Sequence, residues 1–146
     1  MRSGSIGVLP PYLILLTGLP GTGKTTLAVA LKKSLKPNPA YLSTDTVRQR
    51  LFGETRQQYG KTFADLYSPE NRNIVYSALF FMIDILLTHG VSVIVDGTFY
   101  QQQKRQEIYK RADLCKANLI IVEVTCSSRV VKERIEERTL DRKSVV

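Results

Sequence analysis

The sequence predicts an α/β/α sandwich, in which helices cover both faces of a parallel β-sheet. Short apolar segments typical of buried strands alternate with helical segments along the chain, which is the pattern of βαβ units. The first apolar segment also leads directly into a glycine-rich loop that opens a helix. The 146 residues, 43% of them hydrophobic, match one domain with one core. We therefore expect residues 1–146 to form a single domain.

The first strand and helix are the clearest part of this pattern. Tyr12–Thr17 is an almost continuous apolar run, as expected for a strand buried on both faces. A helix begins after Lys24 and ends before Pro37, which cannot continue a helix. The apolar side of this helix, which we expect to face the sheet, consists of Leu27, Ala28, Leu31 and Leu35.

Further strands and helices complete the expected domain. The strands are Ala40–Ser43, Val91–Val95 and Leu119–Thr125. The helices begin at Thr46, at Pro69 after a Ser68 N-cap, at Gln101 and after a Ser127 N-cap. The helix from Pro69 is expected to pack through Ile74, Val75, Ala78, Leu79, Met82, Ile85 and Leu86. Residues 53–67 are polar and poorly periodic, which predicts a loop with irregular helix.

The loop after the first strand reads G-x-x-x-x-G-K-T over Gly18–Thr25, the pattern of a phosphate-binding P-loop. Its glycines let backbone N–H groups approach phosphate oxygens, and the following helix presents unpaired N–H groups to them. Lys24 adds a positive charge at the β- and γ-phosphates, and the Thr25 hydroxyl suits Mg²⁺. The alternative is a glycine-rich turn that happens to carry a lysine. The expected nucleotide-binding residues are Gly18, Leu19, Pro20, Gly21, Thr22, Gly23, Lys24, Thr25 and Thr26.

Asp96 directly follows the expected strand Val91–Val95. In parallel sheets flanked by helices, ligands bind beyond the carboxyl ends of the strands, and P-loop enzymes place a second Mg²⁺-organising carboxylate there. The alternative is a carboxylate that caps the next loop through its own backbone. We expect Asp96 to be catalytic and to form the metal site together with Thr25.

Asp45 and Arg48 follow the second strand and lie one helical turn apart. A carboxylate near the γ-phosphate accepts the proton of an acceptor hydroxyl, and an arginine beside it holds an anionic acceptor through its two-pronged guanidinium. The alternative is an Asp45 that only caps the helix, with Arg48 in solvent.

Aromatic residues recur at four-residue spacing after this helix, at Tyr59, Phe63 and Tyr67. This is the spacing of one helix face. It predicts buried core, with an aromatic wall for a base as the alternative.

Two arginines four residues apart, Arg134 and Arg138, share one face of the last expected helix. Arginines delivered from a mobile lid neutralise the charge that develops in phosphoryl transfer, so residues 127–146 are the expected lid region. The alternative is a solvated helix whose arginines pair with neighbouring glutamates. Arg105, on the preceding helix, faces either the acceptor site or water.

The net charge is +8, and the excess lies mostly in residues 1–75, which contain 10 basic and 4 acidic side chains. A basic surface favours anionic partners such as nucleotides and phosphorylated molecules. No run of Lys or Arg exceeds two residues, so no dedicated nucleic-acid arm is indicated. Cys115 and Cys126 fall in no C-x-x-C pattern and predict reduced thiols in a cytoplasmic protein. The longest apolar stretch, Leu79–Leu87, is too short to span a bilayer.

Together these motifs resemble the small P-loop kinases of the AAA_33-type group. This group includes polynucleotide 5′-hydroxyl kinases, archaeal seryl-tRNA kinases, adenylylsulfate kinases and gluconate-type sugar kinases. The resemblance covers residues 12–143. It rests on Leu15–Thr26, Ser43–Arg48, Val95–Phe99, Arg105 and Glu133–Arg138. The P-loop indicates nucleotide binding, and the ordered set of motifs indicates a kinase.

The resemblance implies an ATP- and Mg²⁺-dependent kinase that phosphorylates a hydroxyl group of a small molecule or a nucleic acid. It implies that Asp45 is the general base and that Asp96 is the strand-end carboxylate of the active site. Arg134 and Arg138 match arginines at the base of a lid that contact ATP. The expected substrate-binding residues are Asp45, Arg48 and Arg105. The implied strand order is 2-3-1-4-5.

The chain departs from this family pattern in two ways. These kinases normally continue past the lid with a fifth strand or a closing helix, whereas this chain reaches only Val146, so we expect a truncated or minimal form. No acceptor-specific signature lies in residues 53–67, so the acceptor is open, and the basic first half favours one that bears phosphate. Two other interpretations are a nucleotide-binding ATPase or switch module without an acceptor, and an inactive fragment.

Overall fold

Strands and helices alternate along the chain in the computed structural model, which describes residues 9–59, 66–126, 129, 133 and 135–137. The strands are β1 (Tyr12–Thr17), β2 (Ala40–Ser43), β3 (Val93–Gly97) and β4 (Asn118–Glu123). The helices are α1 (Lys24–Ser34), α2 (Thr44–Tyr59), α4 (Pro69–Thr88) and α5 (Gln102–Leu114). Of the expected helix after Ser127, only residues 129, 133 and 135–137 are described, and all five are helical.

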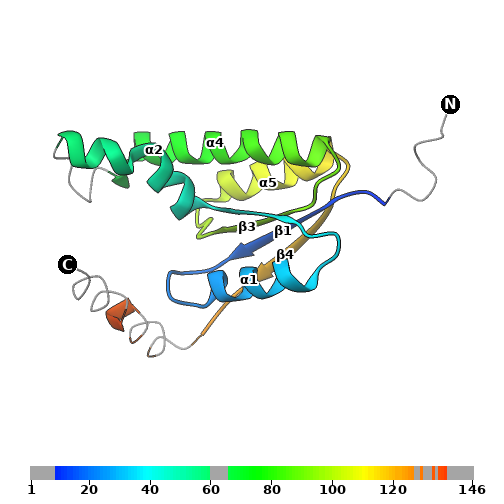
Figure 1. Ribbon diagram of the computed structural model, residues 1–146, viewed down its shortest axis with the longest axis horizontal. Helices are drawn as coiled ribbons and strands as arrows, with labels where there is room; N and C mark the ends of the chain where they lie inside the picture. The colour runs from blue at the N-terminus through cyan, green and yellow to red at the C-terminus, as the bar shows by residue number, and fades with distance from the viewer. Residues whose placement is uncertain (1–8, 60–65, 127–128, 130–132, 134, 138–146) are drawn as a thin grey trace.

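The four strands form one parallel sheet in the order β2-β3-β1-β4. Helix α1 packs on one face of the sheet, and α2, α4 and α5 cover the other (Figure 1). This is the predicted α/β/α sandwich, and its strand order confirms the expected 2-3-1-4. No fifth strand occurs among the residues that the structure describes.

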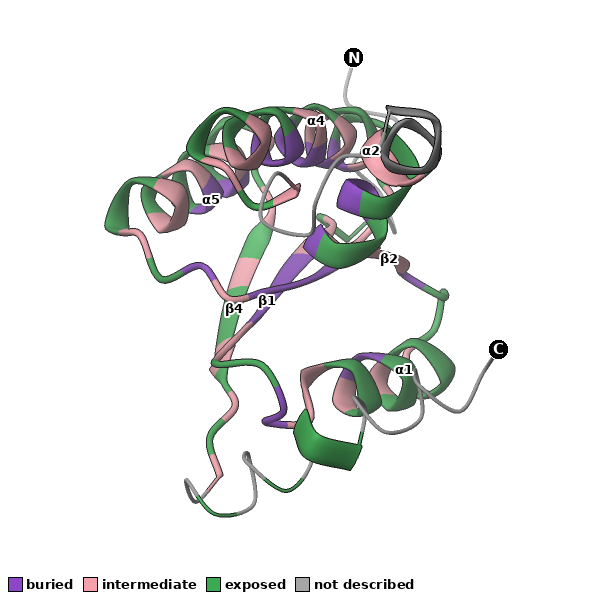
Figure 2. Ribbon diagram, turned by 90° about the vertical axis from the view of Figure 1, so that its left-hand side faces the viewer, coloured by how far each residue is buried: buried purple, intermediate pink, exposed green. Residues whose placement is uncertain are grey.

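The central strands divide the core into two layers, as Figure 2 shows by burial. Leu13 and Leu15 of β1 point into the larger layer beneath α4 and α5, whereas Ile14 and Leu16 point toward α1. All four are almost fully buried. This alternation of two buried faces explains why β1 is a continuous apolar run rather than an alternating one.

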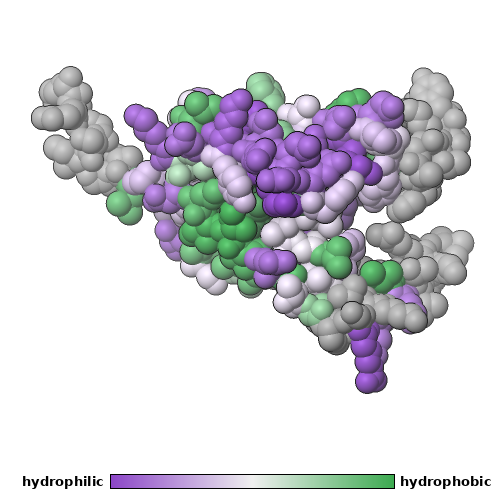
Figure 3. All heavy atoms as spheres, turned by 180° about the vertical axis from the view of Figure 1, so that it is seen from behind, coloured by the Kyte–Doolittle hydropathy of each residue, from purple (hydrophilic) through white to green (hydrophobic). Residues whose placement is uncertain are grey.

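Strand β4 forms one edge of the sheet and is less buried than its neighbours. Ile120 and Ile121 both remain more than two-fifths exposed. The rear view in Figure 3 shows hydrophobic side chains gathered on this side of the molecule, below a hydrophilic helical layer. No helix in the described part of the chain is long and apolar enough to cross a membrane.

Helix α4 begins as predicted, but it is rotated relative to the expected packing face. The Asn71 amide donates to the Ser68 Oγ at 3.3 Å, and Pro69 occupies the first turn. Ile74 and Ile85, both expected in the core, are 48% and 44% exposed. An aromatic contact accounts for the rotation, because Tyr76 packs edge-on against Phe99 with ring centroids 5.1 Å apart. The buried α4 residues are Val75, Tyr76, Leu79, Phe80, Ile83 and Leu87.

Helix α2 is longer than predicted. Residues 53–59, expected to be loop with irregular helix, continue α2 without a break as far as Tyr59. A single glycine costs a helix only about 1 kcal/mol, and the residues after Gly53 include Glu, Arg and Gln, which are good helix formers. The prediction was therefore wrong because it gave too much weight to polarity and to one glycine.

Replacing Gly53 by alanine is expected to stabilise the protein, because Gly53 lies in a helix. A Cβ at this position would meet the Gln49 Cγ at 3.4 Å, an ordinary contact distance. Urea denaturation should show a gain of about 0.5–1 kcal/mol in the free energy of unfolding. A lower free energy of unfolding in Gly53→Ala would contradict the helical conformation of residue 53.

The same substitution at Gly97 is expected to have the opposite effect. A Cβ there would lie 2.8 Å from the Phe99 Cε2 and 2.9 Å from the Thr44 Cγ2, and both neighbours are buried. Overpacking of this kind costs about 1–3 kcal/mol. The stability of Gly97→Ala is measured by the same urea denaturation. If this variant is as stable as the parent protein, the close contact of Gly97 with Thr44 and Phe99 is wrong.

Candidate active site

The P-loop connects β1 to α1 in a conformation that requires glycine. Gly18, Gly21 and Gly23 have φ values of 149°, 82° and 102°. A Cβ on Gly18 would also collide with the carbonyl oxygen of Val124, which follows β4. The loop is thus folded tightly against the carboxyl ends of the strands.

Lys24, at the start of α1, folds back over this loop. Its Nζ donates to the carbonyl oxygens of Gly18 and Leu19 at 2.7 and 3.0 Å. The Thr22 hydroxyl also donates to the Leu19 carbonyl, at 2.7 Å. These contacts hold the loop in a curved shape and place the lysine charge inside it.

Asp96 is the buried carboxylate of the site, with 4% of the residue exposed. It is the fourth residue of β3, not the first residue after the strand, and it pairs in register with Leu16 and Ser43 on the neighbouring strands. Its Oδ2 accepts hydrogen bonds from the Thr25 Oγ1 at 3.1 Å and from the Tyr41 hydroxyl at 2.7 Å. The Asp96 carboxylate of β3 thus contacts Tyr41 of β2 and Thr25 of α1, the helix that follows β1. The contact between Thr25 and Asp96 was expected from the sequence.

Tyr41 was not identified as a site residue from the sequence. Burial, followed by the hydrogen bond to the Asp96 carboxylate, raises the pKa of Tyr41 to about 12. Tyr41 therefore stays protonated and donates a hydrogen bond to Asp96 across the physiological pH range. The available signal was the implied strand order, which places the strand of Tyr41 beside β3, but the sequence does not give the register that brings Tyr41 to Asp96.

Asp45 and Arg48 form an ion pair in the first turn of α2, with the Arg48 Nη1 3.0 Å from the Asp45 Oδ1. The alternative of an Asp45 cap is wrong, because α2 begins at Thr44 and the Ser43 Oγ accepts from the Thr46 amide at 3.5 Å. The alternative of a solvated Arg48 is also wrong, because only 9% of its side chain is exposed. Asp45, in contrast, is 83% exposed.

Tyr67 covers the Arg48 guanidinium, with the Arg48 Cζ 4.3 Å from its ring centroid. Of the aromatic stripe proposed from the sequence, Tyr67 is partly exposed rather than core, and Phe63 lies outside the described residues. Tyr67 thus stacks on an arginine of the site, a contact that the four-residue spacing did not predict.

These groups line one cleft of about 440 Å³. Its walls come from the P-loop, the start of α2, the end of β3 and the first turns of α4. The chemistry-bearing residues that line it are Lys24, Thr25, Asp45, Arg48, Tyr67, Arg72, Tyr76, Asp96 and Tyr100. The structure therefore brings the predicted P-loop residues together with Asp45, Arg48 and Asp96. It adds Arg72, Tyr76 and Tyr100, which the sequence did not indicate.

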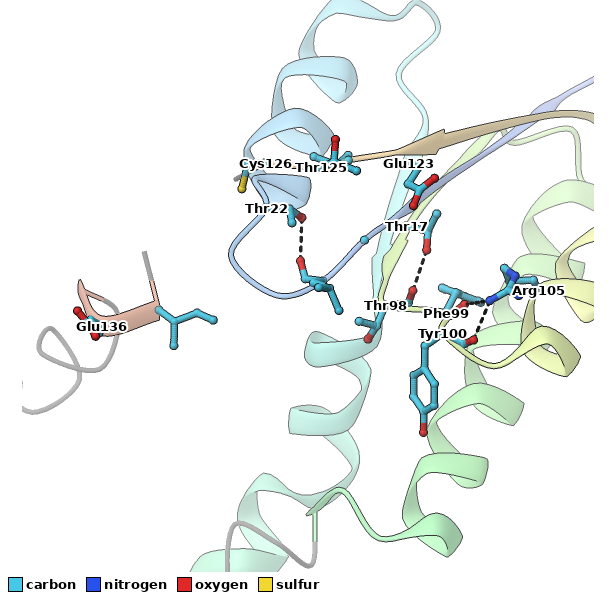
Figure 4. Close-up of a pocket in the computed structure, with 14 residues that line it drawn as sticks. Thr17, Thr22, Thr98, Phe99, Tyr100, Arg105, Glu123, Thr125, Cys126 and Glu136 are labelled. Atoms are coloured by element: carbon cyan, nitrogen blue, oxygen red, sulfur yellow. Dashed lines mark hydrogen bonds between the residues drawn. The ribbon is translucent and has the colours of Figure 1, made fainter. Parts of the chain in front are cut away.

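A second cavity of about 750 Å³ lies at the carboxyl ends of β1, β3 and β4 (Figure 4). The Thr17 hydroxyl donates there to the Thr98 carbonyl at 2.7 Å. The Arg105 Nη1 donates to the carbonyl oxygens of Phe99 and Tyr100 at 2.7 and 2.8 Å. Arg105 lines this cavity and not the cleft that contains Asp45. Its contacts shape the loop after β3, and its role in substrate binding stays a prediction.

The predicted lid arginines, Arg134 and Arg138, lie outside the described residues. Of the lid region that is described, Ile135 lines both cavities, and Arg129 pairs with Glu133 at 3.1 Å. No cluster of three or more His, Cys, Asp or Glu side chains suited to a metal occurs within the described ranges. Both cysteines, Cys115 and Cys126, are free.

Comparison with known proteins gives a family match over most of the chain. The AAA_33 family, described as an AAA domain, matches residues 13–146. An uncharacterized protein of Mycobacterium tuberculosis is 37% identical over 120 residues, which are 81% of this chain and 23% of that protein. L-seryl-tRNA(Sec) kinase of Methanococcus maripaludis is 29% identical over 129 residues, which are 86% of this chain and 46% of the kinase. The chain thus spans less than half the length of either relative.

Among solved structures, a candidate kinase from Chloroflexus aurantiacus superposes with a TM-score of 0.79. It is 26% identical, and the match covers 94% of this chain and 71% of that one. The fold described above is thus a kinase-type P-loop fold.

Removing the Tyr41 hydroxyl is expected to destabilise the protein, because Asp96 then loses its shorter hydrogen bond. Tyr41→Phe should lower the free energy of unfolding by about 1–2 kcal/mol at neutral pH, measured by denaturant titration. The matched control is Tyr109→Phe, which removes a hydroxyl from a partly exposed residue of α5 and should change stability little.

The pH dependence gives a second readout of the same change. Because the folded pKa of Tyr41 lies above the ordinary value of 10, its contribution to stability is complete below pH 10 and is lost as the pH rises toward 12. Tyr41→Phe should therefore reduce the loss of stability between pH 10 and 12. An unchanged alkaline profile would contradict the burial of Tyr41 against Asp96.

Proposed function

Because this chain belongs to the AAA_33 family of AAA domains, we propose that it is an ATP- and Mg²⁺-dependent kinase that transfers the γ-phosphoryl group to a hydroxyl. The observation that supports this most strongly is the composition of the cleft that contains Asp45 and Asp96. A P-loop lysine, a buried carboxylate and an exposed carboxylate held by an arginine all line it. The P-loop alone accounts for nucleotide binding. The exposed Asp45 adds a carboxylate that can accept the proton of an acceptor hydroxyl.

The donor end of the cleft is the P-loop. Lys24 already lies within the loop, where its Nζ bonds two carbonyl oxygens. A bound triphosphate would offer it charged oxygens instead, and charge-assisted hydrogen bonds are about twice as strong as neutral ones. The loop amides and the N-terminus of α1 complete this anion site.

The hydroxyl of Thr25 and the carboxylate of Asp96 fit a magnesium site. Both are hard oxygen donors, and they lie 3.1 Å apart. Mg²⁺ prefers one or two such protein ligands together with water and phosphate oxygens. When bound, the ion neutralises charge on the β- and γ-phosphates. Tyr41 fixes the Asp96 side chain through its 2.7 Å hydrogen bond.

Asp45 is the proposed base toward the acceptor. Its carboxylate is exposed at the cleft, and Arg48 fixes its position from the buried side. A positioned carboxylate that accepts or orients the hydroxyl proton contributes about 10²- to 10⁴-fold to the rate. The further assignments carried from the sequence are Arg48 as an acceptor ligand, and Arg134 and Arg138 as lid arginines that neutralise developing charge.

The competing function is an ATPase or nucleotide switch in which Asp45 orients water. The same exposure that opens Asp45 to an acceptor also opens it to solvent. The two functions differ in whether ATP turnover depends on an added alcohol.

Transfer of label from γ-labelled ATP tests the proposal directly. The acceptor panel contains 5′-hydroxyl oligonucleotides, seryl-tRNA, adenylylsulfate, nucleosides and sugars. Labelled product should disappear in Lys24→Ala and fall roughly 10²- to 10⁴-fold in Asp45→Asn. Asp113→Asn, which removes an exposed carboxylate from α5, is the matched control and should retain full activity. ATP turnover that no acceptor changes and that Asp45→Asn does not lower would favour the ATPase.

A further inference from the structure

Helix α4 carries a second apolar stripe, on the side that faces away from the sheet (Figure 2). Ile74, Phe81 and Ile85 are 48%, 66% and 44% exposed. Together with the partly buried Ala78 they follow one another at intervals of four, three and four residues, which is the spacing of a seam that packs against another helix. Single exposed apolar residues are ordinary, but a continuous stripe over about three helical turns marks a contact surface.

Phe81, at the centre of this stripe, forms a ridge between two hollows. An apolar hollow of about 350 Å³ lies between α4, α2 and β2, and a charged hollow of about 420 Å³ lies between α4 and α5. Phe81 lines both of them. A ridge flanked by grooves is the surface onto which a second helix packs. The apolar hollow is lined by residues that include Leu42, Val47, Leu51, Ala78 and Met82, and the charged hollow by residues that include Asp84, Lys104, Glu107 and Arg111.

The stripe is complementary to its own reverse. If two antiparallel copies of α4 are related by a two-fold axis that passes between Ala78 and Phe81, Ile74 of each copy faces Ile85 of the other. Each large Phe81 ring then faces the small side chain of Ala78. The next pair outward is polar on both helices, an asparagine with a threonine. A symmetric contact between two copies requires such self-complementarity, whereas the helix of an unrelated protein does not.

The charges beside the stripe fit the same arrangement. Arg111 lies 3.5 Å from Asp84 and 3.1 Å from Glu107, so that one positive charge meets two negative charges beside the second half of α4. Lys104 lies beside the first half, where its Nζ donates to the Asn73 Oδ1 at 3.0 Å. In an antiparallel pair the positive part of each copy faces the negative part of the other, and the two apolar hollows face each other. A parallel pair would set the charged hollow of one copy against the apolar hollow of the other.

The outer face of the helical layer is large enough for a stable dimer. The 20 residues of α4 span about 30 Å. Because α4 contacts α2 on one side and α5 on the other, and packed helices lie about 8–10 Å apart, this face is about 25 Å wide. Its area of roughly 750 Å² is close to the approximately 800 Å² that each partner buries in a specific interface.

We propose that the protein forms a two-fold symmetric homodimer through the outer face of α4, with the two α4 helices antiparallel and Phe81 at the centre. An exposed aromatic ring at the centre of a contact face is a typical anchor, because it buries a large apolar area on association. The dimer is independent of the proposed kinase function, since the four residues of the stripe line neither the cleft nor the second cavity.

Sedimentation velocity over a series of protein concentrations tests the dimer. The parent protein should be dimeric, and Phe81→Glu should weaken dimerisation roughly 100-fold or more, because it places a charge in the apolar centre of the interface. Its circular dichroism spectrum should match that of the parent. The matched control is Leu114→Glu, which introduces the same charge at an equally exposed residue of α5 outside both hollows and should leave the dimer intact. Ile85→Gln, expected to weaken dimerisation roughly tenfold, serves if Phe81→Glu does not fold.

An exchange of charges tests the antiparallel orientation. Lys104→Glu and Asp84→Lys should each weaken self-association roughly tenfold, because like charges then face each other in each homodimer. An equimolar mixture of these two variants should dimerise as the parent does, because in the mixed dimer each reversed charge faces an opposite charge. A helix of another protein on this face would not produce this recovery.

The proposal is overturned if the parent protein stays monomeric up to about 100 μM, which would leave the face to another protein or to another part of a longer chain. It is also overturned if the dimer survives in folded Phe81→Glu and Ile85→Gln. A mixture of the two charge variants that associates no better than either variant alone would refute the antiparallel pairing.

Discussion

The parallel pairing of β3 between β1 and β2 is the constraint on which the rest of the site depends. Because all three strands run in one direction, their carboxyl ends meet at one edge of the sheet. The register places Asp96 opposite Leu16 on one side and Ser43 on the other. A shift of one residue would turn Asp96 to the opposite face of the sheet and separate it from Thr25 and Tyr41. Such a shift would also place the Asp96 carboxylate among the apolar side chains of the larger core layer, so core packing and site geometry both favour the observed register.

The two carboxylates of the cleft, Asp96 and Asp45, differ in burial and in the charge of their hydrogen-bond partners. Asp96 is buried and accepts hydrogen bonds from two neutral hydroxyls, whereas Asp45 is exposed and is held by a buried arginine. Neutral hydroxyl partners leave the negative charge of Asp96 available to a cation, while Arg48 offsets the charge of Asp45 beside the proposed acceptor. The two carboxylates thus suit different tasks although they line one cleft, which is the division of roles that proton and metal chemistry require.

The parts of the site that the sequence predicted are those encoded by contiguous residues. The P-loop, the Asp45–Arg48 turn and the strand that carries Asp96 each lie within a few positions, so local patterns were sufficient. Tyr41, Arg72 and Tyr100 were missed because their roles come from contacts between distant segments; Arg72, for example, bonds a hydroxyl 28 residues away. The error at α4 has the same cause, since its buried face was selected by the contact of Tyr76 with Phe99, which no helical period reveals. Arg105 was correctly placed in a helix, but the direction of its side chain depends on the loop after β3.

The two ends of the cleft therefore differ in how readily substitutions change them. The donor end is one continuous loop whose shape is imposed by glycines and by its contact with the residue after β4, so few sequences are compatible with it. The other end, where we propose that the acceptor binds, is assembled from α2, α4 and the loop after β3. The relative positions of these elements depend on side-chain packing between α2 and α4 and around Tyr76. A change in that packing would move Arg48 and Arg72 relative to each other without disturbing the P-loop. If the proposed kinase function holds, the acceptor can vary while the phosphate donor stays the same, because different elements of the fold form the two ends of the cleft.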